Sequence, residues 1–166
     1  LSNMIMQLEY DEQKSFAKVV TKLPIRPQYP QLCLNWDEII TLDTHPLVTI
    51  GAHTHTHSAL AMISEEKSLL EMEQSKAFLE NKLGHPIETV AYPFGTANTA
   101  TQREFNCAAI CGFRTGLTTC PVPLMTQSLH SIPRLGVPYF INVLGLRAKL
   151  SGCEYFSRKI MMQNTS

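Results

Sequence analysis

Residues 47–58 read LVTIGAHTHTHS, a short apolar run followed at once by three histidines within five residues. The three successive β-branched residues Val48, Thr49 and Ile50 favour a buried strand over 47–50 that ends at Gly51. Polar side chains directly after such a strand lie at the end where α/β proteins place their sites. The stretch therefore predicts an α/β fold and a functional site at the end of this strand.

The three histidines allow more than one pairing. If the residues after the strand turn into a helix, His53 and His57 stand at i and i+4 on one face and can give two imidazole nitrogens to one metal, while His55 points elsewhere. His-x-His pairs that include His55 also suit the first metal pair of amidohydrolase-like and phosphoesterase-like barrels. Spacing alone leaves both open, but so many histidines after a strand favour a metal over a solvated loop.

Other metal ligands are scarce downstream. Only His85 and His130 follow the cluster, and no aspartate follows Asp43, which weighs against a site with two metals. The five cysteines are an odd number, and Cys107 and Cys111 stand four apart on an expected helix. Buried cysteines are common, so packing is the better interpretation of that pair.

Outward from the histidines, strands and helices alternate. Ser64 is a good N-cap for a helix that Gly84 would end. The pattern predicts one or two helices over 5–23, helices over 36–42, 64–83, 99–111 and 139–150, and strands over 47–50, 88–92, 113–119 and 131–137. This alternation favours a parallel sheet or a piece of a (β/α) barrel.

The length of 166 residues is that of a single domain. Three prolines between positions 24 and 30 separate an N-terminal helical segment with its connection, residues 1–34, from the remaining part, residues 35–166. The first residue is Leu1 rather than Met, and the first residues have the pattern of a helix interior. We therefore expect the natural product to extend further in the N-terminal direction.

The composition argues against several classes of protein. Lys plus Arg number 14 and Asp plus Glu number 14, so the formal charge is zero, and a nucleic-acid surface is not expected. With 44% hydrophobic and 17% charged residues, the chain can build a sizeable core. No run of about 20 apolar residues occurs, so we expect no membrane span.

Several linked motifs occur in consistent order over roughly the last 130 residues. They are LNWDE at 34–38, PLVTIGAHTHTH at 46–57, SEE at 64–66, EQSK at 73–76, AYPFG at 91–95, REF at 103–105, GFRT at 112–115 and IPR at 132–134. In these motifs the chain resembles the polysaccharide deacetylases, the NodB-like family-four carbohydrate esterases. The resemblance implies an α/β protein with a partial, distorted (β/α) barrel, and a hydrolase that removes N-acetyl groups from sugars with a divalent metal, most often zinc.

The resemblance also assigns site residues. The family's His-Ser/Thr-x-x-His motif maps onto His53 and His57 as metal ligands, with Thr54 as the hydroxyl residue that helps fix the loop. His55 falls on a variable position and receives no ligand role. The pair is the one that the i, i+4 spacing also selects.

Two further motifs carry expected catalytic and substrate contacts. In AYPFG, Phe94 would lend its backbone N–H to the oxyanion of the tetrahedral intermediate, Tyr92 and Pro93 would contact the substrate, and Ala91 stands where many relatives have Arg. Arg134 replaces the histidine of a Leu-x-His motif. An arginine is a poor general acid, but it could orient a carboxylate or bind an anionic transition state.

One family motif is absent from the sequence. Relatives carry an N-terminal Asp-Asp pair that supplies the general base and a third metal ligand, whereas Asp11, Asp37 and Asp43 here are isolated. We therefore expect the C-terminal part of a metal-dependent sugar N-deacetylase, inactive on its own. The alternatives are a non-catalytic or vestigial carbohydrate-binding module, and a His-x-His phosphoesterase or amidohydrolase.

The partners follow from the same resemblance. The expected substrate is an N-acetylated polysaccharide or glycan whose identity no motif reveals. The compartment stays open between the cytoplasm and the cell envelope of a bacterium. Open barrel edges in a truncated chain would favour pairing with another copy of the chain.

Overall fold

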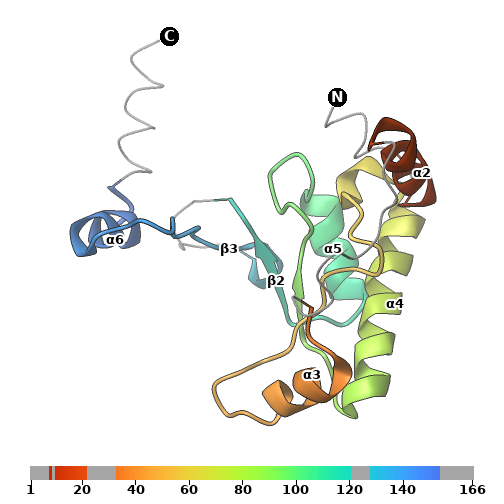
Figure 1. The fold of residues 1–166 in the computed structure, drawn as a ribbon, viewed down its shortest axis with the longest axis horizontal. Helices are drawn as coiled ribbons and strands as arrows, with labels where there is room; N and C mark the ends of the chain where they lie inside the picture. The colour runs from red at the N-terminus through yellow and green to blue at the C-terminus, as the bar shows by residue number, and fades with distance from the viewer. Residues whose placement is uncertain (1–7, 9, 22–32, 121–127, 154–166) are drawn as a thin grey trace.

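The computed structural model describes residue 8 and residues 10–21, 33–120 and 128–153 (Figure 1). The proline-rich connection expected between positions 24 and 30 lies outside these residues, so the expected boundary between 1–34 and 35–166 stays a prediction. Everything that follows concerns the described part of the chain.

Three short parallel strands form the sheet. They are β1 (Thr89–Ala91), β2 (Thr115–Thr118) and β3 (Ile132–Pro133), paired in the order β1-β2-β3. A spatial order that follows the chain order, with helices between parallel strands, is that of a barrel segment. The expected parallel sheet is confirmed as a partial barrel that does not close.

The strand expected over residues 47–50 is wrong. Only Ala52 reaches the sheet, as an isolated parallel bridge in which its N–H donates to Thr89 O and its carbonyl accepts from Ala91 N–H, both at 2.8 Å. Leu47 is 88% exposed, so the apolar run does not enter the core. A β-branched run becomes a strand only where a neighbouring strand pairs with it, and β1 offers this segment one residue of pairing.

The helices begin and end where local chemistry predicts. They are α2 (Tyr10–Thr21), α3 (Trp36–Asp43), α4 (Glu65–Leu83), α5 (Gln102–Ile110) and α6 (Val143–Leu150), with 3₁₀ turns η2 (Leu60–Met62) and η3 (Leu129–Ser131). The Ser64 side chain accepts the Lys67 N–H at the start of α4, and Gly84 ends that helix at φ 77°. The expected helix over 64–83 is thereby confirmed.

The last two elements are shorter than the sequence pattern indicates. The strand expected over 131–137 ends at Pro133. This residue pairs with Thr118, the last residue of β2, so later residues have no pairing partner in the described sheet. The helix expected over 139–150 begins only at Val143, where the Asn142 side chain caps its first turn. Figure 1 shows α6 lying apart from α4 and α5.

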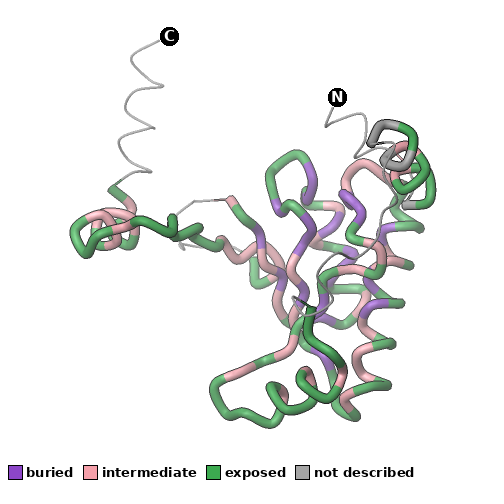
Figure 2. Tube along the Cα trace, viewed as in Figure 1, coloured by how far each residue is buried: buried purple, intermediate pink, exposed green. Residues whose placement is uncertain are grey.

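The core lies where α4, α5 and the strands meet. Figures 1 and 2 show α4 and α5 side by side, with the buried residues gathered between these helices and the sheet. The buried cluster consists of Ala52, Leu60, Met72, Ile87, Val90, Tyr92, Ala100, Cys107, Ala108 and Phe113. The core thus holds the residues directly before and after the histidine loop, which anchors both ends of that loop.

Helix α3 has no buried residue, and three side-chain contacts connect it to the region of α4. Asp43 Oδ2 lies 2.7 Å from His85 Nε2, beyond the end of α4. The Trp36 ring meets the Phe78 ring edge-on, with centroids 5.5 Å apart, and Lys82 Nζ lies 5.5 Å from the centroid of the Trp36 ring. The first contact depends on charge, because a protonated imidazole binds a carboxylate more strongly than a neutral one.

The attachment of α3 is therefore expected to weaken as pH rises. The hydrogen bond that His85 donates to the Asp43 carboxylate, then that with the Pro86 carbonyl, raises the pKa of His85, and Glu80 adds a smaller effect of the same sign. A raised folded-state pKa means that the stabilisation is complete below about pH 6.5, the unfolded value, and is lost as pH rises through the folded value. Hydrogen exchange of α3 amides, corrected for intrinsic rates, should show lower protection at pH 8 than at pH 6. His85→Gln should remove this pH dependence, and an unchanged dependence in that variant would contradict the assignment.

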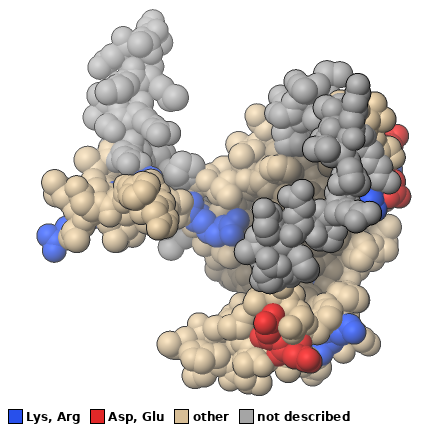
Figure 3. Space-filling view, in the orientation of Figure 1, with Lys and Arg blue, Asp and Glu red and all other residues tan. Residues whose placement is uncertain are grey.

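Charge is sparse on the surface. On the face shown in Figure 3, most of the described surface is uncharged, and the acidic and basic side chains form a few small groups, with acidic beside basic side chains at the lower edge of the view. Across the described residues, each helix is too short or too polar to cross a lipid bilayer.

Candidate functional site

The candidate site lies at the carboxyl ends of the parallel strands. His53 follows the Ala52 bridge, Phe94 follows β1, Thr119 follows β2 and Arg134 follows β3. Because parallel strands end at the same edge, residues that are distant in sequence converge there. This is the edge at which the sequence pattern places the site.

The structure brings His53, His57 and Phe94 together. The ring centroids of His53 and His57 lie 4.8 Å apart, and those of His57 and Phe94 lie 5.2 Å apart, both edge-on. The condition under which i, i+4 spacing pairs the two histidines, a helix over residues 53–57, is not met, because Thr54 (φ 64°) and His57 (φ 62°) have left-handed backbones that fold the segment into a tight loop. The Thr54 hydroxyl accepts the His57 N–H at 3.1 Å and closes the loop.

One imidazole has a fixed tautomer. His53 Nδ1 lies 2.6 Å from the Ala91 carbonyl oxygen, which can only accept, so Nδ1 carries the proton. Its Nε2 is then left with a free lone pair. A histidine that donates one ring N–H to a backbone carbonyl is typical of metal ligands, since the bond orients the ring and raises its basicity.

The described residues fit a metal only in part. Two imidazoles lie together, but no group of three or more His, Cys, Asp or Glu gathers within the described ranges. The ring of His55 has no described partner, and its backbone N–H donates instead to Glu71 Oε2 at 2.9 Å. The donor set therefore suits two ligands of a divalent metal and lacks the third protein ligand that catalytic zinc sites have.

Phe94 presents its backbone to the site. It too has a left-handed backbone (φ 60°), and its ring is 44% exposed. The Thr119 hydroxyl donates to Phe94 O at 2.6 Å, and Thr119 N–H donates to Gly95 O at 2.8 Å, so the end of β2 fixes this turn. Among the described residues none accepts a hydrogen bond from the Phe94 N–H. Non-glycine residues with positive φ concentrate at functional sites, and the three in the described chain are Thr54, His57 and Phe94.

Tyr92 and Pro93 occupy the core rather than the surface of the site. Both are among the fully buried side chains, and the Tyr92 hydroxyl donates to the His130 carbonyl at 2.8 Å. Burial, followed by the Glu104 carboxylate, raises the pKa of Tyr92, so the hydroxyl stays protonated. These positions argue against the expected substrate contacts, and we leave both residues out of the proposed site.

Arg134 and His130 have different surroundings. The Arg134 Nε and backbone N–H both donate to Thr118 O at 3.1 Å, which places this side chain beside Thr119 at the site edge. The ring of His130 instead bonds the Phe113 carbonyl at 2.8 Å, before the start of β2. His130 is therefore a packing residue, as expected of an ordinary loop histidine.

The two cysteines expected to pack do so. Cys107 is fully buried, and burial raises the pKa of Cys111 to about 11, so that thiol stays protonated. Cys111 Sγ lies 3.9 Å from the Leu69 carbonyl on α4. Nothing in their surroundings activates either thiol.

Sequence reasoning missed two residues that shape the site. Glu71 on α4 binds the backbone of the histidine loop, and Thr119 binds the turn that carries Phe94. A signal for Glu71 exists, because it stands three residues after Ser68 and four before Ser75, both of which are buried on α4. An acidic residue beside a buried helical stripe must find hydrogen-bond donors. No comparable signal points to Thr119.

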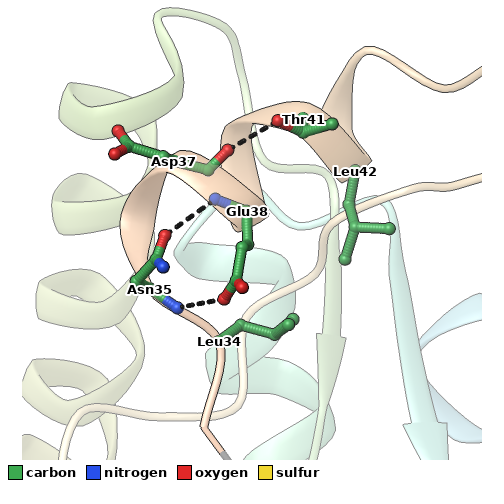
Figure 4. Close-up of a pocket in the computed structure, with 6 residues that line it drawn as sticks. All are labelled: Leu34, Asn35, Asp37, Glu38, Thr41 and Leu42. Atoms are coloured by element: carbon green, nitrogen blue, oxygen red, sulfur yellow. Dashed lines mark hydrogen bonds between the residues drawn. The ribbon is translucent and has the colours of Figure 1, made fainter. Parts of the chain in front are cut away.

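A shallow hollow over α3 is separate from these residues. Figure 4 shows its lining, Leu34, Asn35, Asp37, Glu38, Thr41 and Leu42, and the capping hydrogen bonds between Asn35 and Glu38. All six belong to one short segment, and none is an expected site residue. The hollow is a by-product of how α3 is capped.

Comparison with known proteins agrees with this arrangement. A family model described as polysaccharide deacetylase matches residues 13–114. No curated protein matches the chain.

Solved structures share the fold. The Streptococcus pyogenes deacetylase PplD, determined in complex with acetate, has 20% identity and a TM-score of 0.58 over 70% of this chain and 50% of its own. A Bacillus cereus polysaccharide deacetylase has 21% identity and a TM-score of 0.60 over 70% and 36%. The BpsB deacetylase domain of Bordetella bronchiseptica has 17% identity and a TM-score of 0.57 over 68% and 53%. The chain thus spans about half, or less, of the length of these structures.

Proposed function

Because the chain belongs to the polysaccharide deacetylase family, we propose that it is part of a metal-dependent hydrolase that removes N-acetyl groups from a polysaccharide or glycan. The observation that carries the proposal is the convergence of the His53, His57 and Phe94 rings at the carboxyl ends of the strands. Two imidazoles beside an unused backbone donor are the components needed to bind and polarise an acyl group.

His53 and His57 would hold the divalent metal, with zinc favoured by imidazole ligands. When bound, such an ion supplies a Lewis acid for the acetamide carbonyl. The Ala91 carbonyl would keep His53 Nε2 aimed at the ion through its bond to Nδ1. The ligand set is incomplete within the described residues, so binding by this chain alone is expected to be weak.

Phe94 would stabilise the negative charge that develops on the acetamide oxygen. A backbone N–H needs no particular side chain, so phenylalanine serves as well as tyrosine. The Thr119 hydroxyl holds the Phe94 carbonyl at 2.6 Å and thereby the orientation of this turn. Arg134, at the same edge, would orient a carboxylate or bind an anionic group, since its guanidinium stays charged.

A second candidate function is carbohydrate binding without turnover. It is favoured by one observation, that the described residues bring no third ligand to the histidine pair. A bound water in such a site would have neither a fully held metal nor a neighbouring base to activate it. Both candidates act on the same class of glycan, but only the first releases acetate from it. An assay of binding and acetate release therefore separates them.

The test is acetate release from N-acetylglucosamine oligomers by the full-length gene product that contains these residues. We expect release that requires Zn²⁺ and stops on addition of a chelator. Oligomer binding without release, measured by calorimetry on the same preparation, would favour the non-catalytic module. If the product neither binds the oligomers nor releases acetate, both candidate functions are contradicted.

A further inference from the structure

The histidine loop has a backbone that needs external support. Thr54 and His57 both have positive φ, in a backbone region that residues with a Cβ rarely adopt. This region is least favourable for a β-branched residue such as threonine. The loop forms no helix or strand of its own between Ala52 and η2. Such conformations persist only where surrounding contacts determine them. The contacts within the loop, chiefly the 3.1 Å bond from His57 N–H to the Thr54 hydroxyl, close it without attaching it to the fold.

Glu71 supplies that attachment from α4. Its Oε2 accepts the N–H of His55 at 2.9 Å and the N–H of Thr56 at 2.7 Å. Its Oε1 accepts the Thr56 hydroxyl at 2.6 Å. Both carboxylate oxygens are therefore engaged by the two residues that immediately precede His57.

The hydroxyl bonds extend this support to the other side of His57. The Thr56 hydroxyl has one proton and gives it to Glu71, because a carboxylate only accepts. The 2.8 Å contact between the Thr56 and Ser58 hydroxyls must then be donated by Ser58, which is buried. The chain Ser58 to Thr56 to Glu71 thus brackets His57 on both sides.

We propose that Glu71 is a positioning residue that sets His57 opposite His53. This inference rests on the proposed function, in which the two imidazoles bind one metal. Glu71 is not a base for that reaction, because its three hydrogen bonds occupy the carboxylate. Its effect is on the spacing of the two rings, whose centroids lie 4.8 Å apart.

The side-chain chemistry distinguishes two substitutions. Glu71→Ala removes all three acceptor contacts and leaves the two backbone donors of the loop unpaired. Glu71→Gln keeps most of the pattern, because the amide oxygen can accept both N–H groups while its NH₂ donates to a Thr56 hydroxyl that turns toward Ser58. A positioning role therefore predicts loss in the alanine variant and rescue by glutamine. Glu73→Ala on the same helix is the matched control, since Glu73 is exposed and outside the loop contacts.

The experiment combines Zn²⁺ titration with NMR on the whole 166-residue chain. Partners that orient metal ligands are typically worth 10–100-fold in affinity, so we expect Glu71→Ala to weaken Zn²⁺ binding by about 10-fold or more. Glu71→Gln should stay within about threefold and Glu73→Ala within about twofold of the unmodified chain. Equal affinities of Glu71→Ala and Glu73→Ala, with both variants folded, would overturn the inference.

NMR of the metal-free chain separates this inference from the proposed function. Cross-relaxation between the His53 and His57 rings, and slow exchange of the His55 and Thr56 amides, should be lost in Glu71→Ala and kept in Glu71→Gln. If the unmodified chain binds no Zn²⁺, the proposed function fails, while these signals still test the positioning role. Should Glu71→Ala fail to fold, Thr56→Val deletes the two hydroxyl bonds, to Glu71 and to Ser58, keeps the backbone bonds to Glu71, and should weaken the contact between the His53 and His57 rings. Unchanged ring signals in a folded variant would refute the role.

Discussion

Replacing His53 or His57 with alanine is expected to remove Zn²⁺ binding by this chain, whereas His55→Ala should leave it intact. Loss of a residue that only hydrogen-bonds a metal ligand lowers metal affinity about 10–100-fold. Loss of one of the two ligands should therefore lower Zn²⁺ affinity at least about 100-fold, which is about 2.7 kcal/mol. The two rings lie 4.8 Å apart and His53 is already oriented by the Ala91 carbonyl. Calorimetry at about pH 7.5, where imidazoles are mostly neutral, measures the effect.

The three variants carry the same chemical change within one loop, so each serves as a control for the others. His55 is exposed and its backbone N–H bond to Glu71 survives truncation to alanine, so His55→Ala is the matched control for folding. Binding that depends on His55 would instead favour the His-x-His hydrolases. Full loss of acetate release in His53→Ala and His57→Ala of the full-length product should accompany the loss of Zn²⁺.

The boundaries of α3 and α4 could be predicted because they depend on neighbouring residues. Ser64 accepts an N–H from the first turn of α4, and Gly84 takes the left-handed backbone at its end. Asn35 and Glu38 form a capping box at the start of α3 by the same local chemistry. Each of these signals lies within four residues of the boundary that it sets, so no knowledge of the fold is needed.

The histidine loop could be predicted only in its composition. The i, i+4 argument selects His53 and His57 on the condition of a helix, whereas the structure has a loop there whose backbone bonds Glu71, sixteen residues away in sequence from His55. A left-handed backbone at His57 follows from such distant contacts. The strand expected over 47–50 fails for a related reason, since strand formation depends on a partner that the local sequence does not describe.

The burial of Tyr92 had a signal in the sequence. Successive strand residues face opposite sides of a sheet, so Val90 and Tyr92 share a face and Ala91 takes the other. The structure buries Val90 and Tyr92 completely and leaves Ala91 partly exposed. Applying the two-residue period through β1 into the motif would have placed Tyr92 in the core, where its hydroxyl bonds the His130 carbonyl.

Of the substitutions proposed, Gly116→Ala is expected to lower the free energy of unfolding most. Gly116 lies in the central strand β2, and an added Cβ would overlap the Tyr92 hydroxyl and come within 2.6 Å of the His130 carbonyl oxygen. Overpacking costs about 1–3 kcal/mol, and breaking the buried bond from Tyr92 to His130 adds about 1–3 kcal/mol, so the free energy of unfolding should fall by about 2–6 kcal/mol. Urea denaturation monitored by circular dichroism measures this fall.

A matched control and a rescue decide whether the Tyr92 hydroxyl is the cause. Gly136→Ala makes the same change where a Cβ meets nothing within 4 Å, so its effect should stay within about 0.5 kcal/mol. Tyr92→Phe removes the nearest of the three atoms that crowd the new Cβ, so adding it to Gly116→Ala should cost less than the sum of the two single changes by about 1 kcal/mol or more. Strict additivity would show that His130, rather than Tyr92, limits the space beside β2. In either case the strand that fixes Phe94 through Thr119 has no room for a side chain at position 116, which makes this glycine a requirement of the site as well as of the sheet.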